Sequence, residues 1–232
     1  QKAQDEAGVH DLTIDKARVF YNHPEFILAN ADRIRQAMAE IKAEDRPATR
    51  IAFTAHSIPM SMANGSQYEA QLRESCRLVA EELGIDEGRW SLVYQSRSGR
   101  PQDPWLEPDI LDHLRDLKEH GKDVSGVIVH PIGFLSDHME ILYDLDEEAA
   151  DLCREIELPM VRSKTVGTHR AFVRMIRELI CERIAGASVE ERRAVGQFGP
   201  SHDHCPVDCC PAPQRPSRAA THGAPASTTR LA

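Results

Sequence analysis

Short apolar segments alternate with longer amphipathic segments along most of the chain. The apolar runs predict strands at residues 12–20, 50–56, 90–96, 124–134 and 159–163. The amphipathic stretches, bounded in three places by Pro24, Gly84 or Gly121, predict helices at residues 24–41, 67–83, 108–120, 137–157 and 168–185. Strands that alternate with helices imply right-handed crossovers and a mostly parallel sheet with helices on both faces. The pattern therefore predicts the α/β fold class.

The carboxyl ends of the predicted strands are the expected place for functional residues, because open α/β sheets bind ligands at that edge. These ends lie just after Phe53, Tyr94 and Val129. Polar residues follow each of them, namely His56, residues 95–97 and the run 130–138. We therefore expect one binding edge that gathers three loops.

Composition narrows the class of protein. The chain has 232 residues, of which 41% are hydrophobic and 28% are charged, as in ordinary globular proteins. The net charge of -9 and the lack of a basic cluster argue against nucleic acid as the main partner. No apolar run approaches the roughly 20 residues of a membrane-spanning helix, and the N-terminus lacks the pattern of a secretory signal. We therefore expect a cytoplasmic protein, while the oligomeric state stays open.

The two ends of the chain differ from the α/β region. The first residue is Gln1, and residues 1–8 have the pattern of a helix end, so we expect a fragment whose upstream part is absent. From Gly196 onward the composition shifts toward proline, serine, threonine and alanine. We therefore divide the chain into an α/β domain with a connecting segment (1–195), a cysteine-containing segment (196–213) and a disordered tail (214–232).

Two motifs at the predicted binding edge carry chemistry, and each has a structural alternative. His56 follows a buried strand, where a lone histidine often only bonds a loop carbonyl. Glu140, Asp144 and Glu148 are spaced four apart, which on a helix gives a row of carboxylates about 6 Å apart. Such a run is usually a solvated acidic face. Its start at the binding edge and the mutual repulsion of its charges favour a functional row instead.

The cysteines fall into two groups. Cys205, Cys209 and Cys210 lie in a proline-rich segment that has no core to bury them. Three close thiols in a protein expected in the cytoplasm indicate a metal site rather than disulfides, and zinc with His202 or His204 is one form of it. The other cysteines are predicted to be small buried residues inside helices: Cys76, Cys153 and Cys181.

Three segments together resemble the ferrochelatase family. They are residues 54–60 (TAHSIPM) with Tyr68 and Gln71, residues 94–110 (YQSRSGRPQDPWLEPDI), and residues 130–148, which contain SDHMEILYDLDEE. The sequence departs from the family pattern at residues 65–68, where Gly-Ser-Gln-Tyr replaces the usual Gly-Asp-Pro-Tyr. The resemblance extends over residues 12–213, and the motifs occur in the family's order.

The resemblance implies an enzyme that inserts Fe²⁺ into a porphyrin bound between two similar α/β domains. This chain resembles the second, chelatase-like Rossmann-type domain, with the N-terminal domain missing, and alone it is expected to be inactive. Ferrous iron and the porphyrin are the implied substrates. His56 is the implied catalytic residue, and Glu140 is implied to face it across the porphyrin.

The resemblance also implies further roles. Metal contacts fall to His56 and Glu140. The chemistry of carboxylate oxygens, which suit a hydrated metal or protons, adds Asp144 and Glu148 to them. The implied substrate-binding residues are Ser57, Gln95, Ser96, Trp105, Ser136 and His138. The implied ligands of a [2Fe-2S] cluster are Cys205, Cys209 and Cys210, with the fourth thiolate supplied by upstream sequence. Their spacing is similar to the actinobacterial form, which favours coproporphyrin III over protoporphyrin IX as substrate.

Two other interpretations compete with this one. The first is a class II chelatase for another metal, which shares the fold and a His/Glu pair but not the Gln-Ser and Trp-Leu-x-Pro elements. The second is a haem- or porphyrin-binding module without catalysis, against which the presence of both His56 and Glu140 argues. Which group takes the pyrrole protons and which delivers iron stays open.

Overall fold

The fold is built on a four-stranded parallel sheet, seen in a computed structural model that describes residues 2–11, 13–207 and 209. The strands are β1 (Thr49–His56), β2 (Trp90–Gln95), β3 (Gly126–His130) and β4 (Met160–Arg162), in the order β2-β1-β3-β4. Every pair in the sheet is parallel. The predicted α/β class and parallel sheet are therefore confirmed.

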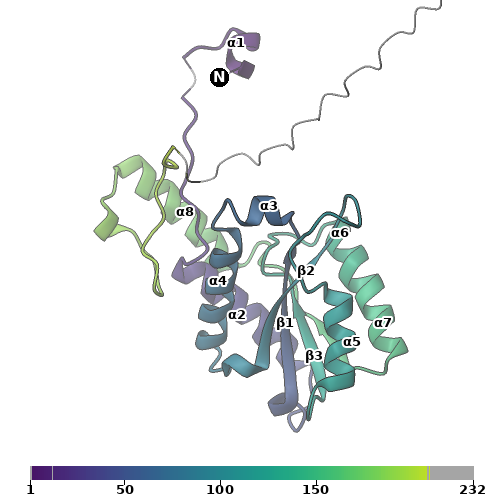
Figure 1. The fold of residues 1–232 in the computed structure, drawn as a ribbon. Coiled ribbons are helices and arrows are strands. Elements are labelled where there is room, and N and C mark those ends of the chain that lie inside the picture. The colour runs from purple at the N-terminus through teal and green to yellow at the C-terminus, as the bar shows by residue number, and fades with distance from the viewer. Residues whose placement is uncertain (1, 12, 208, 210–232) are drawn as a thin grey trace, which may run out of the picture.

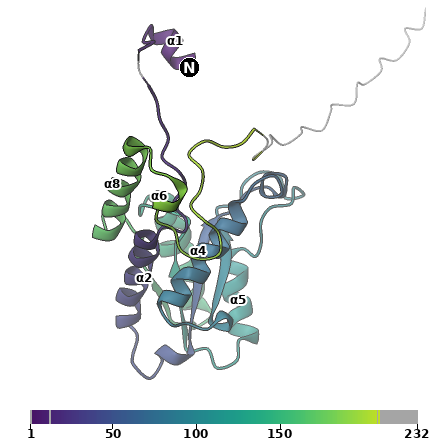
Figure 2. The same cartoon turned by 90° about the vertical axis from the view of Figure 1, so that its left-hand side faces the viewer.

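Helices cover both faces of this sheet (Figure 1). On one side lie α2 (Pro24–Ala39), α4 (Tyr68–Glu82) and α8 (Arg170–Ala185), which Figure 2 shows from the front. On the other lie α5 (Ile110–His120) and a helical stretch made of α6 (Met139–Ile141), the π-helix η3 (Leu142–Ala149) and α7 (Ala150–Glu155). The short elements are α1 (Lys2–Ala7), η1 (Arg46–Ala48), α3 (Met60–Ala63), η2 (Glu87–Arg89) and η4 (Val189–Glu191).

Two hydrophobic clusters, one on each face, hold the layers together. Along β1, Ile51 and Phe53 pack with α2, α4 and α8, while Ala52 packs with α5 and the 139–155 stretch. β3 alternates in the same way, with Ile128 on the first side and Val127 on the second. Side chains of a strand point alternately to its two faces, so a strand buried on both sides reads as a continuous apolar run.

The strand predicted at residues 12–20 is wrong. Leu12 lies outside the described residues, and residues 13–20 are extended but pair with no strand. The apolar side chains of Ile14 and Val19 are exposed. The segment runs beside α8 instead, where buried Arg18 donates to the carboxylate of Glu182 (Nε–Oε2 2.9 Å). A long-range ion pair, which no local pattern signals, places this segment.

Other predicted boundaries are close to the observed ones. The strand predicted at 124–134 ends at His130, and the predicted 108–120 helix starts at Ile110, where the Asp109 side chain accepts from the Leu111 N–H (2.8 Å). The predicted helix at 137–157 is observed at 139–155 with a π-helical centre. Among the described helices, none is long and apolar enough to cross a membrane.

Candidate active site

His56 is the last residue of β1, at the carboxyl edge of the sheet. Its Nδ1 lies within hydrogen-bond distance of the Ser57 carbonyl oxygen, and its own carbonyl accepts from the Tyr68 hydroxyl (2.9 Å). A carbonyl only accepts, so Nδ1 carries the proton of the neutral ring and Nε2 carries the lone pair. The local carbonyl bond expected of a lone histidine is therefore present, and it orients the ring.

Glu140 faces this histidine from the start of the helical stretch after β3. Its Oε1 lies 3.2 Å from His56 Nε2, and the two side chains are 38% and 40% exposed. Oε1 itself is buried and accepts no hydrogen bond from the residues that the structure describes. Two acceptor atoms, His56 Nε2 and Glu140 Oε1, therefore face each other. Their lone pairs are satisfied only when a proton or a metal ion lies between them.

The loop that carries Trp105 is bound along the loop that follows His56. Ser57 donates its N–H to the Gln95 carbonyl (2.8 Å) and its hydroxyl to the Leu106 carbonyl (2.8 Å). Leu106 donates in turn to the Ile58 carbonyl (3.0 Å), and half-buried Trp105 lies opposite Pro59. Ser57 and Gln95 are buried, so their contacts in this structure hold the two loops together.

Asp144 links the π-helix to the end of β2. Its Oδ2 accepts from Gln95 Nε2 (3.0 Å) and from the Ser96 hydroxyl. Ser96 has a left-handed backbone (φ 61°), which costs a non-glycine residue about 1 kcal/mol and turns its hydroxyl to this carboxylate. Asp144 and exposed Glu148 border a hollow of about 210 Å³. Two of the three carboxylates in the predicted row therefore share one hollow.

Asp109 lines the same hollow and was not predicted from the sequence. Burial raises the pKa of its carboxyl, although the Leu111 N–H that it accepts acts in the opposite direction. The sequence signal is an aspartate directly before a helix, which identifies a helix cap but not its neighbours across the sheet edge. A third carboxylate therefore joins Asp144 and Glu148 only in the folded chain.

Ser136 and His138 lie on the exposed loop between β3 and α6. The His138 N–H donates to the Ser136 carbonyl (3.0 Å), and its ring meets Phe134 edge-on with centroids 5.6 Å apart. Their position beside Glu140 is compatible with substrate contact. The substrate-binding role of both residues stays a prediction.

His130 does not belong to the site, although it opens the polar run predicted there. It is fully buried, with Nε2 2.9 Å from Asn30 Oδ1 and Nδ1 2.9 Å from the Ser163 hydroxyl. Since the amide oxygen only accepts, Nε2 carries the proton. Burial lowers the pKa of His130 to about 3. The side chain points into the layer between β3 and α2, a direction that the sequence alone does not give.

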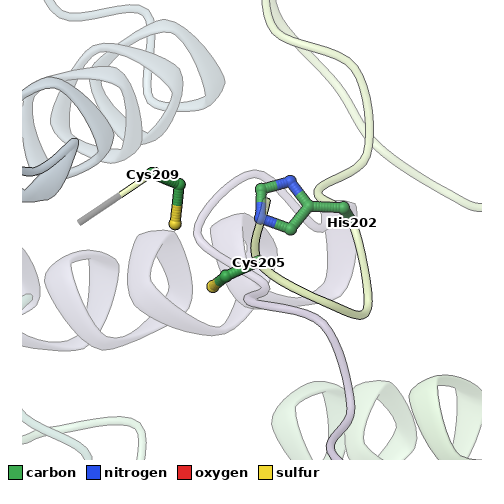
Figure 3. Close-up of side chains that lie close together, drawn as sticks. All are labelled: His202, Cys205 and Cys209. Carbon is green, nitrogen blue, oxygen red and sulfur yellow. The ribbon is translucent and has the colours of Figure 1, made fainter. Parts of the chain in front are cut away.

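The cysteines are placed partly as predicted. Cys76 and Cys153 are buried, and burial raises the pKa of the Cys153 thiol to about 11, but Cys181 is exposed, because its position on α8 faces away from the sheet. His202, Cys205 and Cys209 lie close together, with their ligand atoms all within 4.8 Å of one another (Figure 3). Cys210 and the predicted tail at 214–232 lie outside the described residues.

Comparisons with known proteins point to one family. A sequence model described as ferrochelatase matches residues 1–184. The ferrochelatase of Rhodopirellula baltica is 50% identical over 217 residues, which cover 93% of this chain and 60% of that protein. The coproporphyrin III ferrochelatases of Streptomyces griseus and Streptomyces coelicolor are 45% and 44% identical, over 88% and 96% of this chain and 58% and 62% of those proteins.

The chain thus spans about 60% of the length of these curated relatives. The family match covers most of the chain, including the strand end that carries His56 and the stretch that carries Glu140. Identity of 44–50% extends over nearly the whole sequence. The chain therefore belongs to the ferrochelatase family.

Proposed function

We propose that the protein containing this chain inserts Fe²⁺ into a porphyrin in haem biosynthesis, with His56 and Glu140 as the central pair. The observation that carries the proposal is the 3.2 Å approach of His56 Nε2 and Glu140 Oε1 with no proton donor between them in the neutral ring. A nitrogen and an oxygen that both offer lone pairs suit a reaction in which protons leave and a metal arrives.

The chemistry assigns tasks to these groups. Metallation removes two pyrrole protons and replaces the waters of the ferrous ion with pyrrole nitrogens. His56 Nε2 is free to accept a proton, because Nδ1 is held by the Ser57 carbonyl. Glu140 adds a negative charge beside it, which stabilises either the imidazolium or an arriving Fe²⁺.

Asp144 and Glu148 form the proposed approach route for hydrated metal or for leaving protons. They follow Glu140 along the same helical stretch and border one hollow. Carboxylate oxygens bind hydrated divalent ions without stripping all their water. Asp144 Oδ2 already accepts two hydrogen bonds, whereas Glu148 is exposed. We therefore assign the first contact with the hydrated metal or the leaving proton to Glu148.

The porphyrin is proposed to be coproporphyrin III, the substrate named for the two Streptomyces relatives. The residues proposed to contact it lie at the carboxyl ends of the strands or in the loops that follow them: Ser57, Gln95, Ser96, Trp105, Ser136 and His138. Since Ser57 and Gln95 are buried, they are proposed to shape the loops that meet the porphyrin.

The C-terminal segment is proposed to hold a [2Fe-2S] cluster through Cys205, Cys209 and Cys210. Thiolates are the preferred ligands of such clusters, and Cys205 and Cys209 already lie within reach of one common centre. When bound, the cluster supplies one-electron chemistry and cross-links the segment.

The test is a metallation assay with the longest product of the gene. Coproporphyrin III and protoporphyrin IX are each supplied with Fe²⁺, Co²⁺ or Ni²⁺ under anaerobic conditions. We expect the fastest turnover with Fe²⁺ and coproporphyrin III. Preference for Co²⁺ or Ni²⁺ over Fe²⁺ would favour the class II chelatase, and tight porphyrin binding without metallation would favour the non-catalytic module.

A further inference from the structure

The segment at 195–199, which leads to the cysteines, is fixed to the domain by a buried carboxylate. Glu74, on α4, has a side chain only 1% exposed. Its Oε1 accepts from the Gln197 N–H (3.0 Å), and its Oε2 accepts from Gln197 Nε2 (3.1 Å). Arg77 donates to both oxygens, and these bonds hold the pKa of Glu74 below its usual range. Two hydrogen bonds to Glu74 thus place Gln197, and two more from Arg77 fix the carboxylate that accepts them.

Two further contacts place the neighbours of Gln197. Gly196 has φ 83°, and a Cβ atom there would stand 2.1 Å from Glu74 Oε1, so only glycine allows this approach. The backbone carbonyl of buried Asn22 accepts from the Val195 N–H (2.9 Å). The side-chain Nδ2 of Asn22 donates to the carbonyls of Phe198 (2.6 Å) and Gly199 (3.1 Å). Several independent hydrogen bonds therefore fix residues 195–199, which lead to His202.

Ion pairs then separate the two histidines of the segment. Asp203 lies 2.6 Å from Arg192 Nη2 and 3.5 Å from Arg183 Nη1. The Nε2 of His204 lies 3.2 Å from Arg183 Nη2. A guanidinium only donates, so this nitrogen of His204 is occupied as an acceptor. His204 is thereby directed to α8, and the group of close ligand atoms found in the described residues contains His202 but not His204.

His202 lies on the side of the cysteines instead. Figure 3 shows its imidazole gathered with the thiols of Cys205 and Cys209, and all three ligand atoms lie within 4.8 Å of one another. Ligand atoms around one tetrahedral zinc stand about 3.7 Å apart, given metal–ligand bonds of about 2.0–2.3 Å. The observed upper limit of 4.8 Å lies within about 1 Å of that spacing. The set is therefore near the geometry of a real site.

We infer that the His202 imidazole is a ligand of the metal centre in this segment, together with Cys205 and Cys209. The inference rests on the proposed metal centre and changes its ligand set, because the imidazole takes a place that a fourth, upstream thiolate would otherwise fill. Imidazole nitrogen and thiolate sulfur together bind zinc, and histidine also replaces cysteine in some [2Fe-2S] centres, where it raises the reduction potential. The shared chemistry is a mixed nitrogen and sulfur site.

The experiment compares wild-type protein, His202→Ala, His202→Cys and the matched control His204→Ala, all in the longest product of the gene purified without oxygen. Iron, zinc and acid-labile sulfide are counted per chain, and the visible spectrum and reduction potential are measured. We expect the metal content per chain to fall at least about tenfold in His202→Ala and to stay at the wild-type level in His204→Ala. His202→Cys should restore binding with a lower potential and a changed spectrum.

The outcomes separate this inference from the cluster proposal. If His202→Ala keeps the metal, sulfide and spectrum of the wild type, His202 is not a ligand and the inference is overturned, while the cluster proposal stands. If the wild type holds zinc without sulfide and His202→Ala loses it, His202 is supported and the [2Fe-2S] proposal falls. Wild-type protein without bound metal would overturn both. Because His202 is exposed, loss of metal in its variants does not reflect a failed fold.

Discussion

The sheet edge and the C-terminal segment bring reactive side chains together in two different ways. His56 and Gln95 are the last residues of paired strands, and their positions follow from the register of the sheet. Residues 195–207 include no strand or helix, and Glu74, Asn22 and Asp203 place them through side-chain bonds. A site on strand ends depends on the whole sheet. A site on a segment that is held by side-chain bonds, as residues 195–207 are (the clamped segment), depends on a few atoms. Single substitutions should therefore act differently in the two regions.

The largest effect is expected for His56→Ala or Glu140→Gln at the sheet edge. Either variant should reduce turnover by about 10² to 10⁴-fold, since a positioned acid-base group contributes that much. The thermal midpoint should hardly change, because both side chains are more than one third exposed. Steady-state metallation and a thermal melt measure the two effects. Near-wild-type turnover in both variants would remove the pair from the mechanism.

A large effect on the pH dependence of stability is expected for His130→Gln. This variant tests the buried, neutral histidine between β3 and α2, in the layer under the site. The pKa of His130 in the fold, about 3, is below its ordinary value of 6.5, so unfolded chains take up the proton first. The stability of the wild type should therefore fall as the pH drops from 6.5 toward 3, by up to about 1.4 kcal/mol per pH unit.

The His130→Gln variant should lack this contribution, although losing the ring costs it stability at pH 7. Urea denaturation between pH 7 and pH 4 measures both, with exposed His120→Gln as the control. Equal pH slopes in the wild type and His130→Gln would show that the histidine is not buried in its neutral form.

A smaller, local effect is expected for Gly196→Ala in the clamped segment. A Cβ at Gly196 meets Glu74 Oε1, and the backbone φ there is positive. The hydrogen bonds between Glu74 and Gln197 should therefore break, and the attachment of the segment should weaken by about 1–3 kcal/mol. Limited proteolysis should then cut residues 196–207 faster, while porphyrin metallation at the sheet edge should change little.

Gly199→Ala is the matched control, because a Cβ there meets nothing within 4 Å. Its proteolysis pattern should match that of the wild type. If Gly196→Ala lowers metallation as much as His56→Ala, the two regions are coupled and the contrast between them fails.

The smallest effect is expected for Asp144→Asn combined with Glu148→Gln. If these carboxylates form a route to the pair, the KM for Fe²⁺ should rise about three- to tenfold while the KM for the porphyrin stays near its wild-type value. The hydrogen bonds from Gln95 and Ser96 can persist, since asparagine retains an acceptor oxygen. Equal changes in both KM values would return the row to the role of a solvated face.

The sequence by itself determined the α/β class and the parallel sheet. It also identified the strand ends at His56 and Gln95 and the family that the motifs resemble. These features follow from local periodicity, because an element's hydrophobic pattern records which faces it buries. It also predicted a metal site in the cysteine segment, since thiols without a core need another partner.

Only the tertiary structure decided which of these residues meet. It turned His130 into the core, left residues 13–20 outside the sheet and brought Glu140 to within 3.2 Å of His56, 84 positions away in the chain. It also directed His204 to Arg183 and His202 to the cysteines. Each of these outcomes depends on contacts between distant segments, which local patterns do not encode, because a side chain's direction is set only when the layers pack.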